Sequence, residues 1–407
     1  MDLDGPLHAR LDQASLLLSQ GRLAEMLDVL EPLLPLLGND ASFQCARGIA
    51  LLTLDEPEAG ELALRRAVAL NPRLSRARVY HAAALADLGQ TQEALNAYEE
   101  ALRLEPENPE ARTHRALLWL SRGRLAEGWE EYEWRFRLSS HLLGGPPPHT
   151  PRWSGEPLEG RTLLLLAEQG LGDTLQFARF AARAKEAHPR ATVILECQPE
   201  LVRLLQGAPG FDAVVRRGPA PPPHDVHLPL LSLPRFFCPD PAAIPPPLFL
   251  PAVEIPAAPP PGSPRRIGVA WAGGRANTKD RSRSCPPEAL APLRNAANVE
   301  WINLQKEAPG AAWLPFASDL SACEDFLDTA RVVAGLDLVI TVDTAVAHLA
   351  GSLGKPVWIL LPEPSCWRWM TEAEATPWYP SARLFRQARH GDWDGLLARV
   401  ATELARI

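Results

Sequence analysis

Cysteine, methionine and tyrosine are scarce in this sequence, with six, three and four residues among 407. The cysteines lie far apart without a CxxC pair, which argues against a metal site or a disulfide framework and favours a reducing compartment. No apolar run approaches the roughly 20 residues of a membrane span. The first residues lack the apolar core of a secretory signal. We therefore expect a cytoplasmic protein with no membrane span.

An excess of positive charge is also absent. The net charge is −8, from 49 acidic residues against 41 lysines and arginines. A general nucleic-acid-binding protein needs a basic face that displaces counterions, so we expect no nucleic-acid partner. The composition is 46% hydrophobic and 22% charged, which is typical of a folded globular protein. The length predicts two or three domains.

A 34-residue repeat fills residues 1–140. The offset aligns four positions at the expected turn between two helices: Gly21, Asp55, Gly89 and Gly123. It also aligns small residues where helices approach closely, and prolines that cannot continue the second helix: Ala82, Ala94, Ala101, Pro72 and Pro106. The pattern resembles the tetratricopeptide repeat. We count four units, the first degenerate as an end cap would be: residues 7–40, 41–74, 75–108 and 109–138.

The tetratricopeptide resemblance implies a superhelix with a concave surface that binds a protein or peptide. The alternative is that the repeats only brace the region that follows them. Within the last unit, Trp129, Tyr132 and Phe136 recur at helical spacing, and we expect most of them in the core. A proline- and glycine-rich linker over 141–160 follows.

Short apolar runs alternate with helical segments from residue 161 onward, which predicts parallel, doubly wound sheets. A proline-rich linker (256–264) separates two Rossmann-like halves, 161–255 and 265–407. The strands expected are 161–169, 191–198, 211–217, 225–230, 265–271, 299–305, 336–343, 355–362 and 381–387. The helices expected are 172–188, 199–208, 287–297, 325–335, 344–353 and 392–406. Two such halves place the carboxyl ends of their strands at a shared cleft.

The first candidate site follows the first of these strands. Gly170 and Gly172 form a turn before Asp173, at the start of the next helix. Glycines let the backbone approach a ligand, and a carboxylate in the first turn would project into the cleft. Asp173 could equally cap its own helix, and the local pattern does not choose between the two. Glu168, which precedes the turn, is expected to orient the loop.

The second candidate site is the end of the strand at 336–343. Thr344, Ala345 and Val346 begin the next helix, and their small side chains leave backbone N–H groups open at its positive end. A diphosphate fits such a place. Asp343 could accept hydrogen bonds from sugar hydroxyls or cap the helix. His348 is either a donor-binding residue or a packing residue.

The third candidate site is a basic loop after the strand at 265–271. Four cations fall within nine residues of an otherwise acidic protein: Arg275, Lys279, Arg281 and Arg283. Charge-assisted contacts with phosphate oxygens would explain them, and a solvated basic loop is the alternative. We also assign Gln305 and Lys306, at the end of a strand in the same half, to this donor site.

These stretches together resemble glycosyltransferase family 9, the heptosyltransferase-like enzymes of the GT-B fold. The matching segments are EQGLGDTLQFARF, VAWAGG with DRSRS, VDTAVAHLAG, and GKPVWILLP with WRW and PWYPSARLFRQ. Bacterial tetratricopeptide proteins that carry this domain C-terminally are more similar still. The resemblance covers about 150–407. The two-half outline by itself would also suit a periplasmic-binding-like or an epimerase-like pair.

The resemblance implies roles for particular residues. Asp173 falls on the general base, Asp343 to His348 fall on the donor-binding segment, and Arg283 falls where the family has a phosphate-binding lysine. Ala345 departs from the family, which has a glycine there. The pair Asp392 and Asp394 looks like a metal-binding DxD, but it sits at a helix start, where capping is the better interpretation, and GT-B enzymes need no such metal.

We therefore predict an inverting, metal-independent glycosyltransferase without a cofactor. It would transfer a sugar from a nucleotide-sugar donor to an acceptor hydroxyl on a protein recruited by the repeats. Three alternatives stay open: a glycan or lipid acceptor of the heptosyltransferase type, a protein O-GlcNAc-type transferase, and a non-catalytic tetratricopeptide scaffold.

Overall fold

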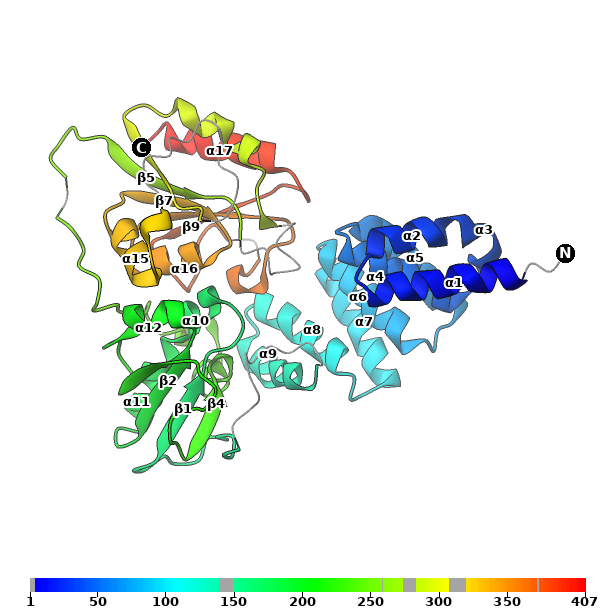
Figure 1. The fold of residues 1–407 in the computed structure, drawn as a ribbon, viewed down its shortest axis with the longest axis horizontal. Helices are drawn as coiled ribbons and strands as arrows, with labels where there is room; N and C mark the ends of the chain where they lie inside the picture. Colours follow the sequence, from blue (N-terminus) through cyan, green and yellow to red (C-terminus); the bar gives the residue numbers. More distant parts are fainter. Residues whose placement is uncertain (1–3, 139–148, 258, 274–282, 307–319, 372) are drawn as a thin grey trace. The chain divides into compact units, whose positions relative to one another are not determined.

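The computed structural model describes residues 4–138, 149–257, 259–273, 283–306, 320–371 and 373–407 (Figure 1). The chain forms two compact units, which we describe separately. The first comprises Met1–Leu118 and Glu131–Ser139, and the second comprises Trp119–Glu130 and Ser140–Ile407. The fourth expected repeat is thus divided between the two units. Among the described residues, no helix has the length and apolarity to cross a bilayer.

Helices in antiparallel succession build the repeat region (blue to cyan in Figure 1). Consecutive helices pack as α1 with α2, α4 with α5, and α6 with α7. Their bounds are α1 (Asp4–Ser19), α2 (Leu23–Leu30), η1 (Glu31–Leu33), α3 (Leu34–Leu37), α4 (Ala41–Thr53), α5 (Pro57–Leu70), α6 (Ser75–Asp87), α7 (Thr91–Leu104), α8 (Pro109–Ser121), α9 (Leu125–Tyr132) and η2 (Glu133–Arg137). In the first repeat unit, Pro32 and Pro35 break the second helix into α2, η1 and α3. The degenerate sequence of this unit therefore shows in its structure as a broken helix.

The four aligned turn positions all have left-handed backbone. Their φ angles are 70° at Gly21, 67° at Asp55, 72° at Gly89 and 73° at Gly123. Glycine adopts this conformation without strain, and aspartate is one of the few other residues that tolerates it. The aligned small residues are buried: Ala82, Ala94 and Ala101 are fully inaccessible to solvent. The repeat register read from the sequence is therefore confirmed.

A four-stranded parallel sheet forms the first half of the second unit, in the order β3-β2-β1-β4. The central strand β1 is an unbroken leucine run, buried over most of its length, as expected for a strand covered on both faces. The elements are β1 (Thr162–Leu166), α10 (Leu171–Phe177), α11 (Phe180–Ala187), β2 (Thr192–Cys197), α12 (Pro199–Leu205), β3 (Ala213–Arg216), β4 (Val226–Pro229), η3 (Leu230–Ser232), α13 (Pro234–Phe237) and η4 (Pro241–Ala243). The single helix expected over 172–188 is divided into α10 and α11 at Ala178 and Arg179, although both residues keep helical backbone angles.

A five-stranded parallel sheet forms the second half, in the order β6-β5-β7-β8-β9. Its elements are β5 (Arg265–Ala270), η5 (Pro287–Asn295), β6 (Val299–Asn303), η6 (Leu320–Ala322), α15 (Phe326–Ala334), β7 (Leu338–Val342), α16 (Ala345–Ser352), β8 (Val357–Leu361), η7 (Trp367–Trp369), β9 (Ala382–Arg386) and α17 (Trp393–Leu404). The segment expected as a helix at 287–297 is a 3₁₀ helix. Pro292 lies inside it and removes a backbone donor that an α-helix would need.

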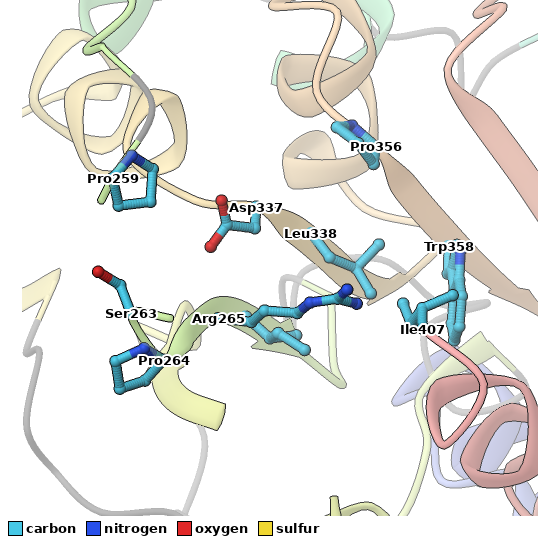
Figure 2. Close-up of a pocket in the computed structure, with 10 residues that line it drawn as sticks. Pro259, Ser263, Pro264, Arg265, Asp337, Leu338, Pro356, Trp358 and Ile407 are labelled. Carbon is cyan, nitrogen blue, oxygen red and sulfur yellow. The ribbon is translucent and has the colours of Figure 1, made fainter. Parts of the chain in front are cut away.

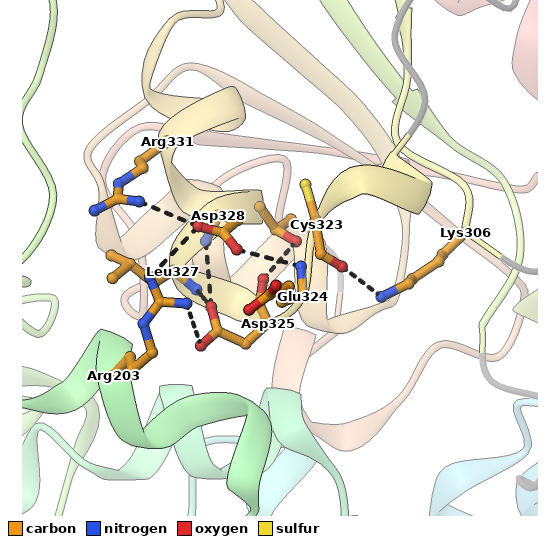
Figure 3. Close-up of polar contacts among 9 residues, drawn as sticks. Arg203, Lys306, Cys323, Glu324, Asp325, Leu327, Asp328 and Arg331 are labelled. Atoms are coloured by element: carbon orange, nitrogen blue, oxygen red, sulfur yellow. Dashed lines mark hydrogen bonds and ion pairs between the residues drawn. The ribbon is translucent and has the colours of Figure 1, made fainter.

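The two halves of the second unit meet through their helices. Helix α10 packs against α16, and α12 packs against α15, as Figure 1 shows between the green and orange parts of the ribbon. Arg203 on α12 donates a 3.1 Å hydrogen bond to Asp325, which caps α15, and also pairs with Asp328 (Figure 3). The chain therefore contains helical repeats followed by an α/β region with two parallel sheets.

Candidate functional site

Asp173 is the third residue of α10, directly after the turn that follows β1. Its Oδ2 accepts a 2.9 Å hydrogen bond from the backbone N–H of Gly170, so the carboxylate does cap its own helix. Its Oδ1 accepts from the guanidinium of Arg368, which comes from the other half. Glu168 is fully buried and accepts a 3.1 Å hydrogen bond from the N–H of Leu231, which fixes the loop before the turn. Asp173 therefore caps its own helix and also pairs with a residue of the opposite half.

Gly172 is a point where the two halves approach closely. A Cβ atom there would lie 2.8 Å from Cδ2 of His348 and 3.3 Å from Cα of Ala345. We expected this glycine to let the backbone approach a ligand. In the structure it instead lets α10 pack against the first turn of α16. The absence of a side chain thereby brings Asp173 to the start of that helix.

Arg368 is the residue that joins the two halves at Asp173. It lies in η7, between β8 and β9, and its side chain is 12% exposed. Its Nη2 also lies 3.3 Å from Oε1 of Gln169, and its guanidinium covers the ring of Trp367 at 4.4 Å. The loop that carries it is held by Arg386, which donates a 2.8 Å hydrogen bond to the carbonyl of Trp369.

Asp343 directly follows β7 at the carboxyl edge of the second sheet and is buried. Burial raises the pKa of its carboxyl, while the positive charges of Arg368 and Arg283 lower it and the charge of Asp173 raises it. Two carboxylates and two guanidiniums therefore act on one another at this edge. Opposite charges within a few ångströms of a carboxylate favour its ionised form. We call Asp173, Arg283, Asp343 and Arg368 the charged cluster.

His348, for which donor binding and packing were both open, lies in the interior of α16. It is buried, its Nδ1 lies 3.0 Å from the hydroxyl of Tyr379, and its ring stacks on Trp369 with centroids 5.2 Å apart. Burial lowers the pKa of the imidazole well below its usual range, and the positive charge of Arg368 acts in the same direction. The ring is therefore neutral at physiological pH, and its position against Gly172 makes it a packing residue.

The first turn of α16 faces the charged cluster. Thr344 is the N-cap residue, but its side chain makes no capping hydrogen bond and instead lies 3.0 Å from the hydroxyl of Thr341. Thr344, Ala345 and Val346 are half-buried. The N–H groups of a first helical turn have no partner within the helix and carry partial positive charge. This turn can therefore donate hydrogen bonds to an anion.

The basic loop is described only at its end. Arg283 is half-buried, and its charge acts on both Asp343 and His348. Lys279 and Arg281, like Arg275, lie outside the described residues. Gln305 uses its Oε1 to accept hydrogen bonds from the N–H groups of Trp271 (3.1 Å) and Ala272 (2.9 Å). It therefore fixes the backbone where the basic loop begins.

Lys306 does not share the surroundings of Arg283. Its Nζ donates a 3.0 Å hydrogen bond to the carbonyl of Cys323, beside the segment that leads into α15 (Figure 3). The side chain is exposed. The structure thus places the cation of Lys306 on a backbone carbonyl of its own half, whereas Arg283 belongs to the charged cluster.

Two further residues pack beside the elements that carry Asp173 and Arg368, and Trp129 is buried, as its helical spacing predicted. Trp129 on α9 packs edge-on against Phe177 of α10 at 5.8 Å and against Trp367 at 5.6 Å. Arg179 is buried and donates a 2.7 Å hydrogen bond to the carbonyl of Trp378 in the opposite half. The segment WRW at 367–369 is among the stretches that resemble glycosyltransferase family 9, but nothing local indicated its arginine as the partner of Asp173.

Other candidate sites have structural explanations. Asp392 caps α17 by accepting a 3.0 Å hydrogen bond from Gly395, in place of a metal-binding role. Within the described ranges, no group of three or more histidines, cysteines or carboxylates could hold a metal ion. None of the six cysteines forms a disulfide. A pocket of about 400 Å³ lies at the amino ends of β5, β7 and β8 (Figure 2), on the opposite edge of the sheet from the charged cluster.

The comparisons with known proteins bear mainly on the repeats. Residues 82–123 match the family described as TPR repeat, so the tetratricopeptide assignment of the N-terminal region is confirmed. Protein FlbA of Caulobacter vibrioides is 30% identical over 297 residues, which are 62% of this chain and 48% of FlbA. The chain thus spans about half the length of this curated relative.

Among solved structures, similarity was found to tetratricopeptide proteins. The crystal structure of MamA is 22% identical over 32% of this chain and 76% of its own, with a TM-score of 0.30. The first TPR of Spaghetti (RPAP3), bound to an HSP90 peptide, is 25% identical over 27% of this chain and 87% of its own, with a TM-score of 0.26.

Proposed function

We propose that this protein is an inverting glycosyltransferase of the GT-B type that takes a nucleotide-sugar donor. The observation that carries the proposal is the charged cluster, in which Asp173 of the first half pairs with Arg368 of the second half. The charges of both residues and of Arg283 also act on Asp343. Both sheets contribute residues from the carboxyl ends of their strands, where ligands of open α/β sheets bind. The resemblance of these segments to glycosyltransferase family 9 supports the same reaction.

In this proposal Asp173 removes the proton from the acceptor hydroxyl. An ionised carboxylate has about four acceptor positions, and Gly170 and Arg368 use one position on each oxygen. One position on each oxygen is left for a hydroxyl donor. The hydroxyl oxygen then forms a bond to the anomeric carbon as the bond to the nucleoside diphosphate breaks. A positioned base contributes about 10²–10⁴ to such a rate.

The leaving nucleoside diphosphate binds to the second half. The first turn of α16 supplies backbone N–H groups, and Arg283 supplies a guanidinium that forms charge-assisted hydrogen bonds with phosphate oxygens. Preorganised donors of this kind stabilise charge as it develops. Asp343, which is buried beside them, accepts hydrogen bonds from sugar hydroxyls. No metal ion has a step in this reaction.

The repeats recruit the acceptor in this proposal, which is a hydroxyl on a protein. Tetratricopeptide arrays present a concave surface to peptides, and this chain places such an array before the α/β unit. The second candidate function, a non-catalytic scaffold, rests on the same array. The two proposals differ at the charged cluster, which a scaffold does not need.

A thermal-shift panel on the full chain tests the proposal. The panel contains UDP-, GDP-, ADP-, dTDP- and CMP-sugars together with the matching nucleotides. Compounds of one base should raise the melting temperature, since a ligand at 100 times its Kd stabilises the fold by about 2.7 kcal/mol. A flat response to every compound would favour the scaffold.

A further inference from the structure

Arg368 is held in a defined position on both sides of its guanidinium. The side chain lies over the ring of Trp367, and its Nη1 lies 3.2 Å from Sγ of Cys366. The carbonyl of the next residue, Trp369, accepts the 2.8 Å hydrogen bond from Arg386. An arginine anchored in this way presents its donor fork in a fixed direction, at little further cost in side-chain entropy.

That direction is toward carboxylates from both halves. Arg368 donates to Asp173, and its positive charge partly offsets the rise that burial causes in the pKa of Asp343. The charged cluster holds a second guanidinium, Arg283, whose charge acts on Asp343 as well. A diphosphate bound between Arg283 and the first turn of α16 would therefore lie within the field of Arg368.

A guanidinium matches phosphate oxygens as well as carboxylate oxygens, often through two parallel hydrogen bonds. One positive charge shared between two anions stabilises each of them less than it would alone. The carboxylate of Asp173 and a diphosphate are thus competitors for Arg368. What strengthens the contact with one of them weakens the contact with the other.

We propose that Arg368 binds the donor diphosphate and, in doing so, loosens its pair with Asp173, so that the base becomes free to accept a proton when the donor is bound. This inference rests on the proposed function. It assigns to Arg368 a binding contact with the leaving group. It also predicts that nucleotide binding and the Arg368–Asp173 pair oppose each other.

The test is a double-mutant cycle in the full chain, with calorimetric titration of UDP, GDP, ADP and dTDP. R368Q should weaken binding of the preferred nucleotide by about 10- to 100-fold. D173N should tighten it by about 3- to 10-fold, because the competitor for Arg368 loses its charge. In the R368Q background, D173N should have no effect. A purely structural role for the pair predicts no such tightening.

Two further variants keep the cycle interpretable. R183Q removes a surface charge that pairs with Glu186 on α11 and should leave affinity within about twofold of wild type. If R368Q does not fold, R368K replaces it, because lysine keeps the charge and loses the planar fork. R368K should weaken nucleotide binding, and wild-type affinity in R368K would overturn the assignment.

The outcomes separate this inference from the proposed function. If R283A weakens nucleotide binding while R368Q does not, the donor site is supported and the contact between Arg368 and the diphosphate is refuted. If D173N leaves the affinity unchanged or lowers it, the competition is refuted. If wild-type protein binds none of the four nucleotides, the proposed function and this inference fall together.

Discussion

Replacing Gly172 with alanine should push α10 away from α16 within the α/β unit. The new Cβ would lie 2.8 Å from His348 Cδ2 and 3.3 Å from Ala345 Cα. Neither neighbour can move freely, because Tyr379 and Trp369 hold the imidazole and Ala345 contributes backbone. Overpacking of this kind costs about 1–3 kcal/mol. Alanine regains up to about 1 kcal/mol of that through its better helix propensity.

The net expectation for G172A is a loss of about 1–2 kcal/mol, which lowers the melting temperature of a domain this size by roughly 2–8 °C. Gly170 provides the matched control. It is the N-cap residue with extended backbone, φ −89° and ψ 171°, and its added Cβ would lie 3.3 Å from the carboxylate of Asp173. G170A should therefore change stability by less than about 1 kcal/mol.

Thermal and urea unfolding followed by tryptophan fluorescence measures both glycine variants. G172A should also slow transfer, because the displaced α10 moves the carboxylate of Asp173 away from a donor bound at the first turn of α16. A G172A protein with the stability of wild type, or one no less stable than G170A, would refute the close packing of α10 on α16.

Three further predictions concern Asp173, Arg283 and His348. D173N should reduce transfer turnover by about 10²–10⁴ without weakening donor binding, as steady-state kinetics beside calorimetry would reveal, and wild-type turnover would exclude it as the base. R283A should weaken nucleoside diphosphate binding by about 1.5–3 kcal/mol, whereas unchanged affinity would remove its phosphate role. The pKa of His348 is lowered in the folded state, so its neutral ring contributes to stability. That contribution is complete above about pH 6.5, the pKa of a histidine in the unfolded chain, and it is lost as the pH falls through the folded-state pKa. Wild type should therefore lose stability from pH 7.5 to 5.5 more steeply than H348Q, and parallel unfolding profiles would contradict this.

The strands were the most predictable part of this fold. Each is a short apolar run bounded by proline, glycine or charge, and the fully buried β7 and β8 show the pattern of covered parallel strands. The turn positions Gly21 and Gly89 were predictable for a different reason, since a repeat displays the same backbone requirement several times. The break between α10 and α11 was not predictable, because the intervening Ala178 and Arg179 are good helix formers.

Only those features of the candidate site that depend on neighbouring residues in the sequence were predictable. Asp173 and Asp343 each follow a buried strand, and that placement is visible in the sequence. The pair between Asp173 and Arg368 joins residues 195 positions apart, and no local pattern contains it. The role of Gly172 was misjudged for the same reason: its neighbours His348 and Ala345 come from the other half, so packing and ligand approach look alike in the sequence.

The central claim is that Asp173 catalyses transfer of a sugar to a protein. The most direct measurement is intact-mass and glycopeptide mass spectrometry of a protein extract, taken from a strain that lacks this chain, after incubation with the purified protein and each nucleotide sugar of the panel. The wild-type chain should add the mass of one donor sugar to a specific acceptor, and D173N should add it at least about 10²-fold more slowly. No mass gain with any donor, or equal gain with D173N, would contradict the account.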